Sequence, residues 1–284
     1  MQRRGVLQFG AAWGLVQAAP AVRAAEPPLR VGLTAVILAD QAAFLARWSG
    51  YLAQQVGRPV TFVARESYQA ILDLLFSDQL DAAWICGYPY VRHQAQLQLL
   101  AVPMFQGAPR YQSYLIRTLG SPLRGWQDLR GQVLAFSDPL SNSGWLVAQR
   151  QLRLAGLGIG DLRRSFFAHG HRNVVEAVST GLAQAGCVDG YVWETMRHQG
   201  MPAVAKTEVI WRSAEFGFPP IVARAGNADA GLKPLALALQ HMPQDAQGRA
   251  LLKSLNLSGF TSATPALFDS IRELASSVNG GARS

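Results

Sequence analysis

The sequence predicts an α/β fold of two lobes, each a mostly parallel sheet flanked by helices, joined by two hinge crossings of the chain. From residue 29 onward, short apolar runs alternate with longer segments of helical periodicity, which is typical of βαβ units. The chain has 284 residues, 49% of them hydrophobic, and this is enough for one large or two modest cores. We expect residues 26–113 and 215–284 to form lobe 1 and residues 114–214 to form lobe 2.

The N-terminal part of lobe 1 shows the alternation most clearly. Apolar residues at 44, 45, 48, 51, 52 and 56 form the stripe of an amphipathic helix that has Asp40 as its N-cap and Gly57 at its end. Gly87 to Tyr90 is expected to end the third strand. The strands are predicted over Leu29–Leu33, Val60–Ala64, 82–86, 99–103 and 110–117, and the helices over 40–56 and 67–76.

A second series of βα units begins after Pro122. Its strands are predicted over 132–136, over 165–168 and in a short segment ending near Val188, and its helices over 143–154, 172–180 and 191–198. The chain then returns through strands at 208–213 and 219–223 and ends in helices at 232–240, 246–255 and 265–278. Residues 111–117 and 211–219 are the predicted crossings, and a ligand cleft is expected at the carboxyl ends of the strands.

The first 25 residues are predicted to be an export signal peptide. Arg3 and Arg4 precede an apolar run, and Ala24 and Ala25 provide the small residues of a cleavage point. The two arginines also resemble the twin-arginine pattern, so the general secretory and twin-arginine routes both stay open. An uncleaved membrane anchor is disfavoured because two glutamines interrupt the run. We therefore expect a periplasmic protein, cleaved near Ala24 and Ala25.

Composition and charge exclude several function classes. The 26 Lys and Arg against 18 Asp and Glu give a net charge of +8, but the basic residues are scattered and form no stripe of the kind that binds nucleic acid. Two cysteines are too few for a disulfide scaffold or a zinc module. We expect a monomer that binds a small anion, with no cofactor, no metal and no nucleic-acid partner.

Residues 136–146 form the first candidate anion site. After the predicted strand, Pro139 favours a turn, and Ser141, Asn142 and Ser143 then place hydroxyl and amide donors at a helix start. Free backbone N–H groups and the helix dipole make such a start suitable for an oxyanion. An ordinary capping turn uses the same residue types, and this alternative stays open.

A second helix start follows at His171 and Arg172. Positive charge is disfavoured in the first turn of a helix, because the helix dipole is positive at that end. A bound anion would offset this repulsion. In the alternative interpretation, Arg172 extends into water and His171 caps or packs. His169 and His171 also suggest a metal, but no nearby carboxylate or thiolate completes such a site.

Several motifs together resemble a known family. They are Glu66-Ser67-Tyr68-Gln69-Ala70-Ile71, Asp81-Ala82-Ala83-Trp84, Tyr111-Gln112-Ser113-Tyr114-Leu115-Ile116, Asp138-Pro139-Leu140-Ser141-Asn142-Ser143-Gly144, Gly170-His171 and Cys187-Val188-Asp189. Over nearly all of the mature chain, the sequence resembles the periplasmic phosphonate-, phosphite- and phosphate-type solute-binding proteins, which have the type II periplasmic binding protein fold.

The resemblance implies that the protein captures a small oxyanion and delivers it to an ABC transporter permease. The oxyanion would be surrounded by Tyr68, Tyr111, Ser141, Asn142, Ser143 and His171. In relatives, an acid near the position of Asp189 meets a substrate amine; a hinge or capping role is the alternative for Asp189. Asn142 stands where relatives usually carry Thr or Ser, Gln184 replaces a frequent acid, and residues 34–38 are unusually apolar, so the exact ligand stays open.

Cys86 raises a second function. We expect it to point toward the cleft mouth, where an exposed thiolate would bind trivalent arsenic. Some relatives resemble arsenic-oxyanion sensors that signal to a membrane sensor kinase, so arsenite sensing is the alternative function. A packed thiol is the competing structural interpretation, because free cysteines are usually buried. A disulfide between Cys86 and Cys187 would staple the lobes together.

We predict no enzyme. The sequence contains neither a Gly-x-Ser-x-Gly elbow nor a His-Glu-x-x-His pair. Glu194 and His198 at i, i+4 are interpreted as a contact on the helix surface. Cys86 with His171 as nucleophile and base is the remaining enzymatic alternative, and nothing in the sequence supplies a third, orienting group.

Overall fold

The structure of the chain is a computed structural model that describes residues 26–34 and 42–280. The predicted signal peptide, the predicted N-cap Asp40 and loop residues 35–38 lie outside the described residues. Within those two ranges, no helix has the length and apolar character needed to cross a membrane.

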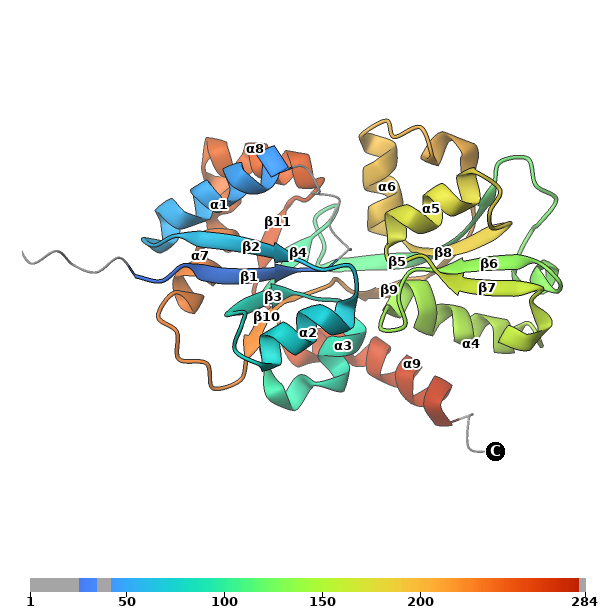
Figure 1. The fold of residues 1–284 in the computed structure, drawn as a ribbon, viewed down its shortest axis with the longest axis horizontal. Coiled ribbons are helices and arrows are strands. Elements are labelled where there is room, and N and C mark those ends of the chain that lie inside the picture. Colours follow the sequence, from blue (N-terminus) through green and yellow to red (C-terminus); the bar gives the residue numbers. More distant parts are fainter. Residues whose placement is uncertain (1–25, 35–41, 281–284) are drawn as a thin grey trace, which may run out of the picture.

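Lobe 1 is built on a six-stranded sheet with the order β11-β4-β10-β3-β1-β2. Its strands are β1 (Leu29–Leu33), β2 (Val60–Ala64), β3 (Ala82–Trp84), β4 (Leu97–Met104), β10 (Ile221–Arg224) and β11 (Gly259–Thr261). Its helices are α1 (Ala42–Val56), α2 (Tyr68–Phe76), α3 (Gly87–Arg92), α7 (Leu232–His241) and α8 (Ala246–Leu255). The last helix, α9 (Asp269–Gly280), packs against α3 of lobe 1 and α4 of lobe 2. Figure 1 shows α1 and α8 on one side of this sheet and α2 and α3 on the other.

Lobe 2 is built on a five-stranded sheet with the order β7-β6-β8-β5-β9. Its strands are β5 (Arg110–Thr118), β6 (Val133–Phe136), β7 (Arg164–Phe167), β8 (Ala185–Asp189) and β9 (Thr207–Gly217), and its helices are α4 (Val147–Leu154), α5 (His171–Ser179) and α6 (Gly190–His198). In Figure 1, α5 and α6 cover one face and α4 the other. The predicted two-lobed α/β fold is thus confirmed.

The sheets are mixed, which corrects the prediction that they are mostly parallel. The pairs β1–β2, β1–β3, β6–β7 and β6–β8 are parallel, as their βαβ connections require. In lobe 1 the strands of the returning chain, β10 and β11, run the other way: β10 is antiparallel to β3 and β4, and β11 is antiparallel to β4. In lobe 2 the reversed strand is β5, which carries the chain out of lobe 1 and is antiparallel to both β8 and β9. The reversal follows from chain passage between the lobes, which no local pattern encodes.

Two elements were not predicted. The segment expected to end the third strand begins α3, whose third residue, Pro89, sits in the first turn, where a missing N–H costs no hydrogen bond. Strand β11 is only three residues long. Short elements leave too little periodicity for sequence patterns to detect.

The chain passes between the sheets in residues 105–109 and 218–220. The two strands that flank these passages, β5 and β9, pair with each other from Arg110–Gly217 to Thr118–Thr207. Trp84 Nε1 donates to the carbonyl oxygen of Pro219 at 2.9 Å and so ties the second passage to β3. The predicted lobe limits, 113/114 and 214/215, fall inside β5 and β9.

The apolar face of helix α1 packs against the sheet of lobe 1 and forms part of its core. This face buries Phe44, Trp48, Tyr51 and Leu52. The Trp48 ring lies 4.7 Å from the ring of Phe62 on β2, measured between centroids. Each fully buried side chain of this size contributes about 1.5–3 kcal/mol, so α1 and β2 stabilise the lobe mainly through this face.

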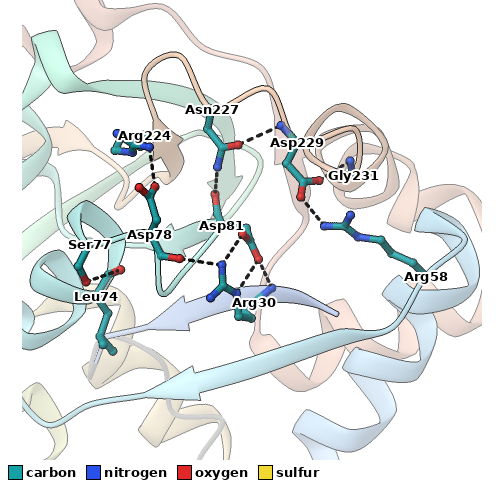
Figure 2. A network of polar contacts seen from close by, with 10 residues as sticks. All are labelled: Arg30, Arg58, Leu74, Ser77, Asp78, Asp81, Arg224, Asn227, Asp229 and Gly231. Carbon is teal, nitrogen blue, oxygen red and sulfur yellow. Dashed lines mark hydrogen bonds and ion pairs between the residues drawn. The ribbon is translucent and has the colours of Figure 1, made fainter. Parts of the chain in front are cut away.

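A polar network closes the end of the lobe 1 sheet where β1 begins (Figure 2). Arg30 donates to both carboxylate oxygens of Asp81, at 3.1 and 2.8 Å, and Arg58 pairs with Asp229 at 2.7 Å. Burial alone would raise the pKa of Asp81, but the hydrogen bonds from Arg30 hold it below its usual value. Because this network is at the amino end of β1, it belongs to the scaffold and lies away from the carboxyl ends of the strands.

Candidate functional site

The eight residues predicted for the site lie at the ends of elements from both lobes, and each is at most 3% exposed. From lobe 1 come Tyr68, the first residue of α2, and Cys86, which follows β3. Lobe 2 provides Tyr111 on β5, Ser141, Asn142 and Ser143 between β6 and α4, His171 at the start of α5 and Asp189 at the end of β8. The contacts below bring them together.

The segment between β6 and α4 is a tight turn. Asp138 begins it by accepting the backbone N–H of Leu140 at 2.7 Å. Leu146 N then donates to the carbonyl oxygen of Ser141 at 3.0 Å, a five-residue spacing that makes Asn142–Leu146 a π-helical turn. Gly144 is required here, because a Cβ at this position would lie 1.9 Å from Ser137 Oγ. The turn therefore holds Ser141 Oγ against His171 at the start of α5, and Asn142 and Ser143 against β5.

His171 is held in one tautomer. The backbone N–H of Asp189 donates to Nδ1 of His171 at 3.0 Å, so Nδ1 carries no proton and Nε2 carries the ring hydrogen. Burial lowers the pKa of His171 to about 3. The ring is consequently a neutral donor throughout the physiological range.

The Nε2 atom of His171 faces two hydroxyls. Its distance is 3.3 Å to the hydroxyl oxygen of Tyr68 and 3.5 Å to Ser141 Oγ. Ser141 Oγ already accepts the N–H of Gly144 at 2.9 Å. Because the oxygens of Tyr68 and Ser141 act as acceptors toward these N–H groups, their own hydrogens stay available for a ligand.

A second polar group surrounds Asn142. Its Nδ2 donates to the hydroxyl oxygen of Tyr111 at 3.0 Å, and its backbone N–H donates to Sγ of Cys86 at 3.3 Å. The carbonyl oxygen of Ser143 accepts from Ser113 Oγ at 2.8 Å. The hydroxyl hydrogen of Tyr111 is thereby left free to donate.

Three buried polar atoms in this region have no hydrogen-bond partner: Ser137 Oγ, Asn142 Oδ1 and Ser143 Oγ. Leaving such an atom unsatisfied costs about 1–3 kcal/mol, so buried polar groups are nearly always paired. Ser137 was not among the predicted site residues. Its position directly before the Asp138-Pro139 turn, at the carboxyl end of β6, was the available signal.

Asp138 is a second residue that sequence analysis missed. Its Oδ2 accepts the backbone N–H of Tyr68 at 3.1 Å, which places a lobe 2 carboxylate at the N-terminus of a lobe 1 helix. Together with the contact between Asn142 and Cys86, it joins the lobes across the site. The backbone amides of Tyr68, Asn142 and Gly144 thus already have protein acceptors, and the side-chain hydroxyls provide further donors.

The site is a cluster of neutral donors. Among the described residues, no lysine or arginine is buried. Burial raises the pKa of Tyr68 and Tyr111 well above the usual value, with the nearby Cys86 adding to the effect, so both phenols stay protonated. The electrostatic attraction to an oxyanion must therefore come from neutral dipoles. These are the O–H and imidazole N–H groups whose hydrogens point at the charge.

The expectation of an exposed thiolate at Cys86 is wrong. Cys86 is 1% exposed, and burial raises its pKa to about 11, so the group is a thiol at neutral pH. Cys187 is buried in the lobe 2 core beside Leu115 and Leu134, and both cysteines are free. A buried strand end looks the same in sequence as one that opens into a cleft.

Asp189 provides a pH dependence that can be measured. Burial raises its pKa to about 8, although its carboxylate caps α6 by accepting the N–H of Tyr191 at 2.8 Å. Below that pH the carboxyl is neutral and tolerates an anion, and above it the carboxylate repels one. We expect the affinity for methylphosphonate, relative to that of Asp189→Asn at the same pH, to fall as pH rises through about 8.

Calorimetric titrations of both proteins between pH 6 and 9 provide the measurement. Because ionisation of the ligand affects both proteins equally, it cancels in the ratio of their two dissociation constants. Asparagine keeps the cap on α6. The raised pKa also predicts a difference in folding stability. Because the pKa of Asp189 is higher in the folded than in the unfolded protein, the free energy of unfolding falls as pH rises toward the folded pKa. At pH 9, Asp189→Asn should therefore be the more stable protein. Identical pH profiles for the two proteins would contradict the assignment.

Other sequence candidates lie outside this cluster. Glu194 pairs with Arg197 at 2.6 Å instead of His198, and Arg172 pairs with Glu176 at 2.9 Å. His169 is exposed and takes a left-handed backbone conformation with φ of 55°. Across the described ranges, no three His, Cys, Asp or Glu side chains are grouped as a metal ion would require.

The fold and the polar cluster between the lobes define a class, the two-lobed type II periplasmic binding proteins. The family described as "ABC transporter, phosphonate, periplasmic substrate-binding protein" matches residues 38–268. The chain belongs to this phosphonate-type periplasmic substrate-binding family, whose members are solute-binding proteins of transporters.

Individual relatives are more distant. The phosphate-import protein PhnD of Mycolicibacterium smegmatis is 28% identical over 176 residues, which cover 57% of this chain and 55% of that protein. The chain thus matches about half the length of this curated relative. PhnD1 of Prochlorococcus marinus in complex with methylphosphonate superposes with a TM-score of 0.77 at 19% identity, covering 88% of this chain and 98% of that one.

A binding-protein component of an ABC phosphonate transporter from Pseudomonas aeruginosa gives a TM-score of 0.80 at 20% identity, covering 89% of this chain and 87% of that one. At these identities, the solved structures establish the fold. They do not transfer a ligand to this chain.

Proposed function

We propose that this protein captures a small oxyanion of the phosphonate, phosphite or phosphate type between its lobes and delivers it to an ABC transporter permease. The supporting observation is the convergence of free hydroxyl hydrogens with unpartnered buried polar atoms in one region where the lobes meet. A tetrahedral oxyanion would satisfy these groups together. We further propose that the protein acts in the periplasm as a monomer after removal of its signal peptide, without enzymatic activity.

The number of donors is sufficient for useful affinity. Micromolar binding corresponds to about −8 kcal/mol. A hydrogen bond to a charged group contributes about 1.5–3 kcal/mol. The hydroxyls of Tyr68, Tyr111, Ser141 and Ser143 together with His171 Nε2 therefore supply interactions of the required size, and the stronger end of that range also offsets the cost of ordering the ligand and closing the lobes.

Cys86 supports one alternative, arsenite sensing through a membrane sensor kinase. Its sulfur lies inside the cluster, where it accepts the N–H of Asn142. Because the group is a thiol, binding of arsenite would have to form an As–S bond with release of the thiol proton and a hydroxyl of arsenous acid as water. The observed neutral donor cluster favours the oxyanion over this alternative.

The two functions are separated by a thermal-shift panel on the purified protein with phosphate, phosphite, methylphosphonate, 2-aminoethylphosphonate, sulfate, arsenate and arsenite. A ligand that binds the folded state raises the melting temperature by mass action. We expect shifts with phosphorus oxyanions that persist in Cys86→Ser. A shift with arsenite alone, lost in Cys86→Ser, would replace oxyanion uptake by the sensor function.

A further inference from the structure

In the side-chain amide of Asn142, the Nδ2 group has a hydrogen-bond partner and the Oδ1 atom has none. The Nδ2 group donates to Tyr111, whereas Oδ1 is completely buried and has no donor. The residue itself is 0% exposed. An amide oxygen can only accept a hydrogen bond, so this atom requires a donor from outside the protein.

The groups around Asn142 do not supply that donor. The backbone N–H of Asn142 itself is directed to Cys86, and that of Gly144 is directed to Ser141. Asp138 accepts from the backbone N–H of Tyr68, and Asp189, which caps α6, forms no hydrogen bond with Oδ1 of Asn142. The hydroxyls of Tyr111 and Ser143 form none with this atom either. In the described part of the chain, buried lysine and arginine are absent. The missing hydrogen must therefore come with the ligand.

We propose that Asn142 determines specificity by accepting the P–O–H hydrogen of a monoprotonated oxyanion, so that the site selects hydrogen phosphonates or hydrogen phosphates over fully ionised anions. This inference rests on the proposed function and adds a ligand protonation state to it. A site that is built to pair a ligand hydrogen rejects an analogue that lacks it, because the buried acceptor then stays unsatisfied.

Methylphosphonate and methanesulfonate form a matched pair of ligands for the test. At pH 6 both are tetrahedral monoanions with one methyl group, and they differ in the single hydrogen of the P–O–H group. Calorimetry with the purified protein is expected to show methylphosphonate binding about 10- to 100-fold more tightly, the effect of one unsatisfied buried acceptor. In Asn142→Ser, whose hydroxyl can donate or accept, this preference should shrink by at least about fivefold.

Tyr68→Phe is the matched control. It removes a donor that serves both ligands, so both affinities should fall and their ratio should stay. Equal affinities for the two ligands in the unaltered protein, or an unchanged preference in Asn142→Ser, would overturn the role of Asn142. Absence of binding by methylphosphonate and by phosphate would instead refute the proposed function, so the two failures are distinguishable.

Discussion

Gly144→Ala should abolish measurable oxyanion binding. The new Cβ would lie 1.9 Å from Ser137 Oγ and 3.1 Å from Cε1 of His171, well inside van der Waals contact. Both neighbours are buried, and Ser137 is backed by β6, so relief requires the π-helical turn to move away from α5. Displacing this turn shifts Ser141, Asn142 and Ser143 together. Overpacking of this kind also costs about 1–3 kcal/mol of stability.

Gly50→Ala is the control for Gly144→Ala. Gly50 lies on the exposed side of α1 with nothing within 4 Å of the position of its Cβ. Alanine there should raise stability by about 0.5–1 kcal/mol and leave binding unchanged. Calorimetric titration with methylphosphonate and thermal unfolding of both variants measure the two effects. Wild-type affinity in Gly144→Ala would refute the placement of the ligand against this turn.

His171→Ala is expected to weaken oxyanion binding by about 1.5–3 kcal/mol, roughly a 10- to 150-fold increase in Kd. The substitution removes the Nε2–H donor and the orientation it gives to Tyr68 and Ser141. It also leaves the buried N–H of Asp189 without its acceptor, so the protein should lose a further 1–3 kcal/mol or so of stability.

His171→Asn separates these two consequences. Its Oδ1 can accept from Asp189 N in place of Nδ1, whereas nothing replaces the donor at Nε2. The affinity loss should therefore persist while most of the stability returns, as read from calorimetry and chemical denaturation in parallel. Should His171→Ala bind methylphosphonate as tightly as the unaltered protein, the histidine would have only a structural role.

Much of the fold could be predicted from local patterns. Strands β1 and β2 occur at their predicted bounds, because each is a short apolar run ended by polar or glycine-containing segments. Helix α2 begins one residue after its predicted first residue, Ser67, which is instead the N-cap and accepts from Ala70 N at 3.2 Å. The strand predicted at 219–223 corresponds to β10, but its antiparallel pairing was not predicted, and β11 was not predicted at all, since the partners of both are set by the long-range return of the chain.

Several residues of the candidate site could be predicted from the sequence, whereas Ser137, Asp138 and the chemistry of the site could not. Ser141, Asn142 and Ser143 could be found because a helix start concentrates polar side chains. The neutral state of His171 depends on the N–H of Asp189, 18 residues away, and on burial. Ser137 and Gly144 act through packing with each other, a contact that no motif in one sequence reveals.

The assignment is tested most directly by a crystal structure of the protein with methylphosphonate. We predict the phosphonate oxygens within hydrogen-bond distance of Ser141, Ser143 and His171 Nε2, with the P–O–H group on Asn142 Oδ1. Phosphonate seated elsewhere, for instance in the open hollow of about 460 Å³ lined by Arg197, His198 and Lys253, would contradict a cluster of neutral donors as the binding site.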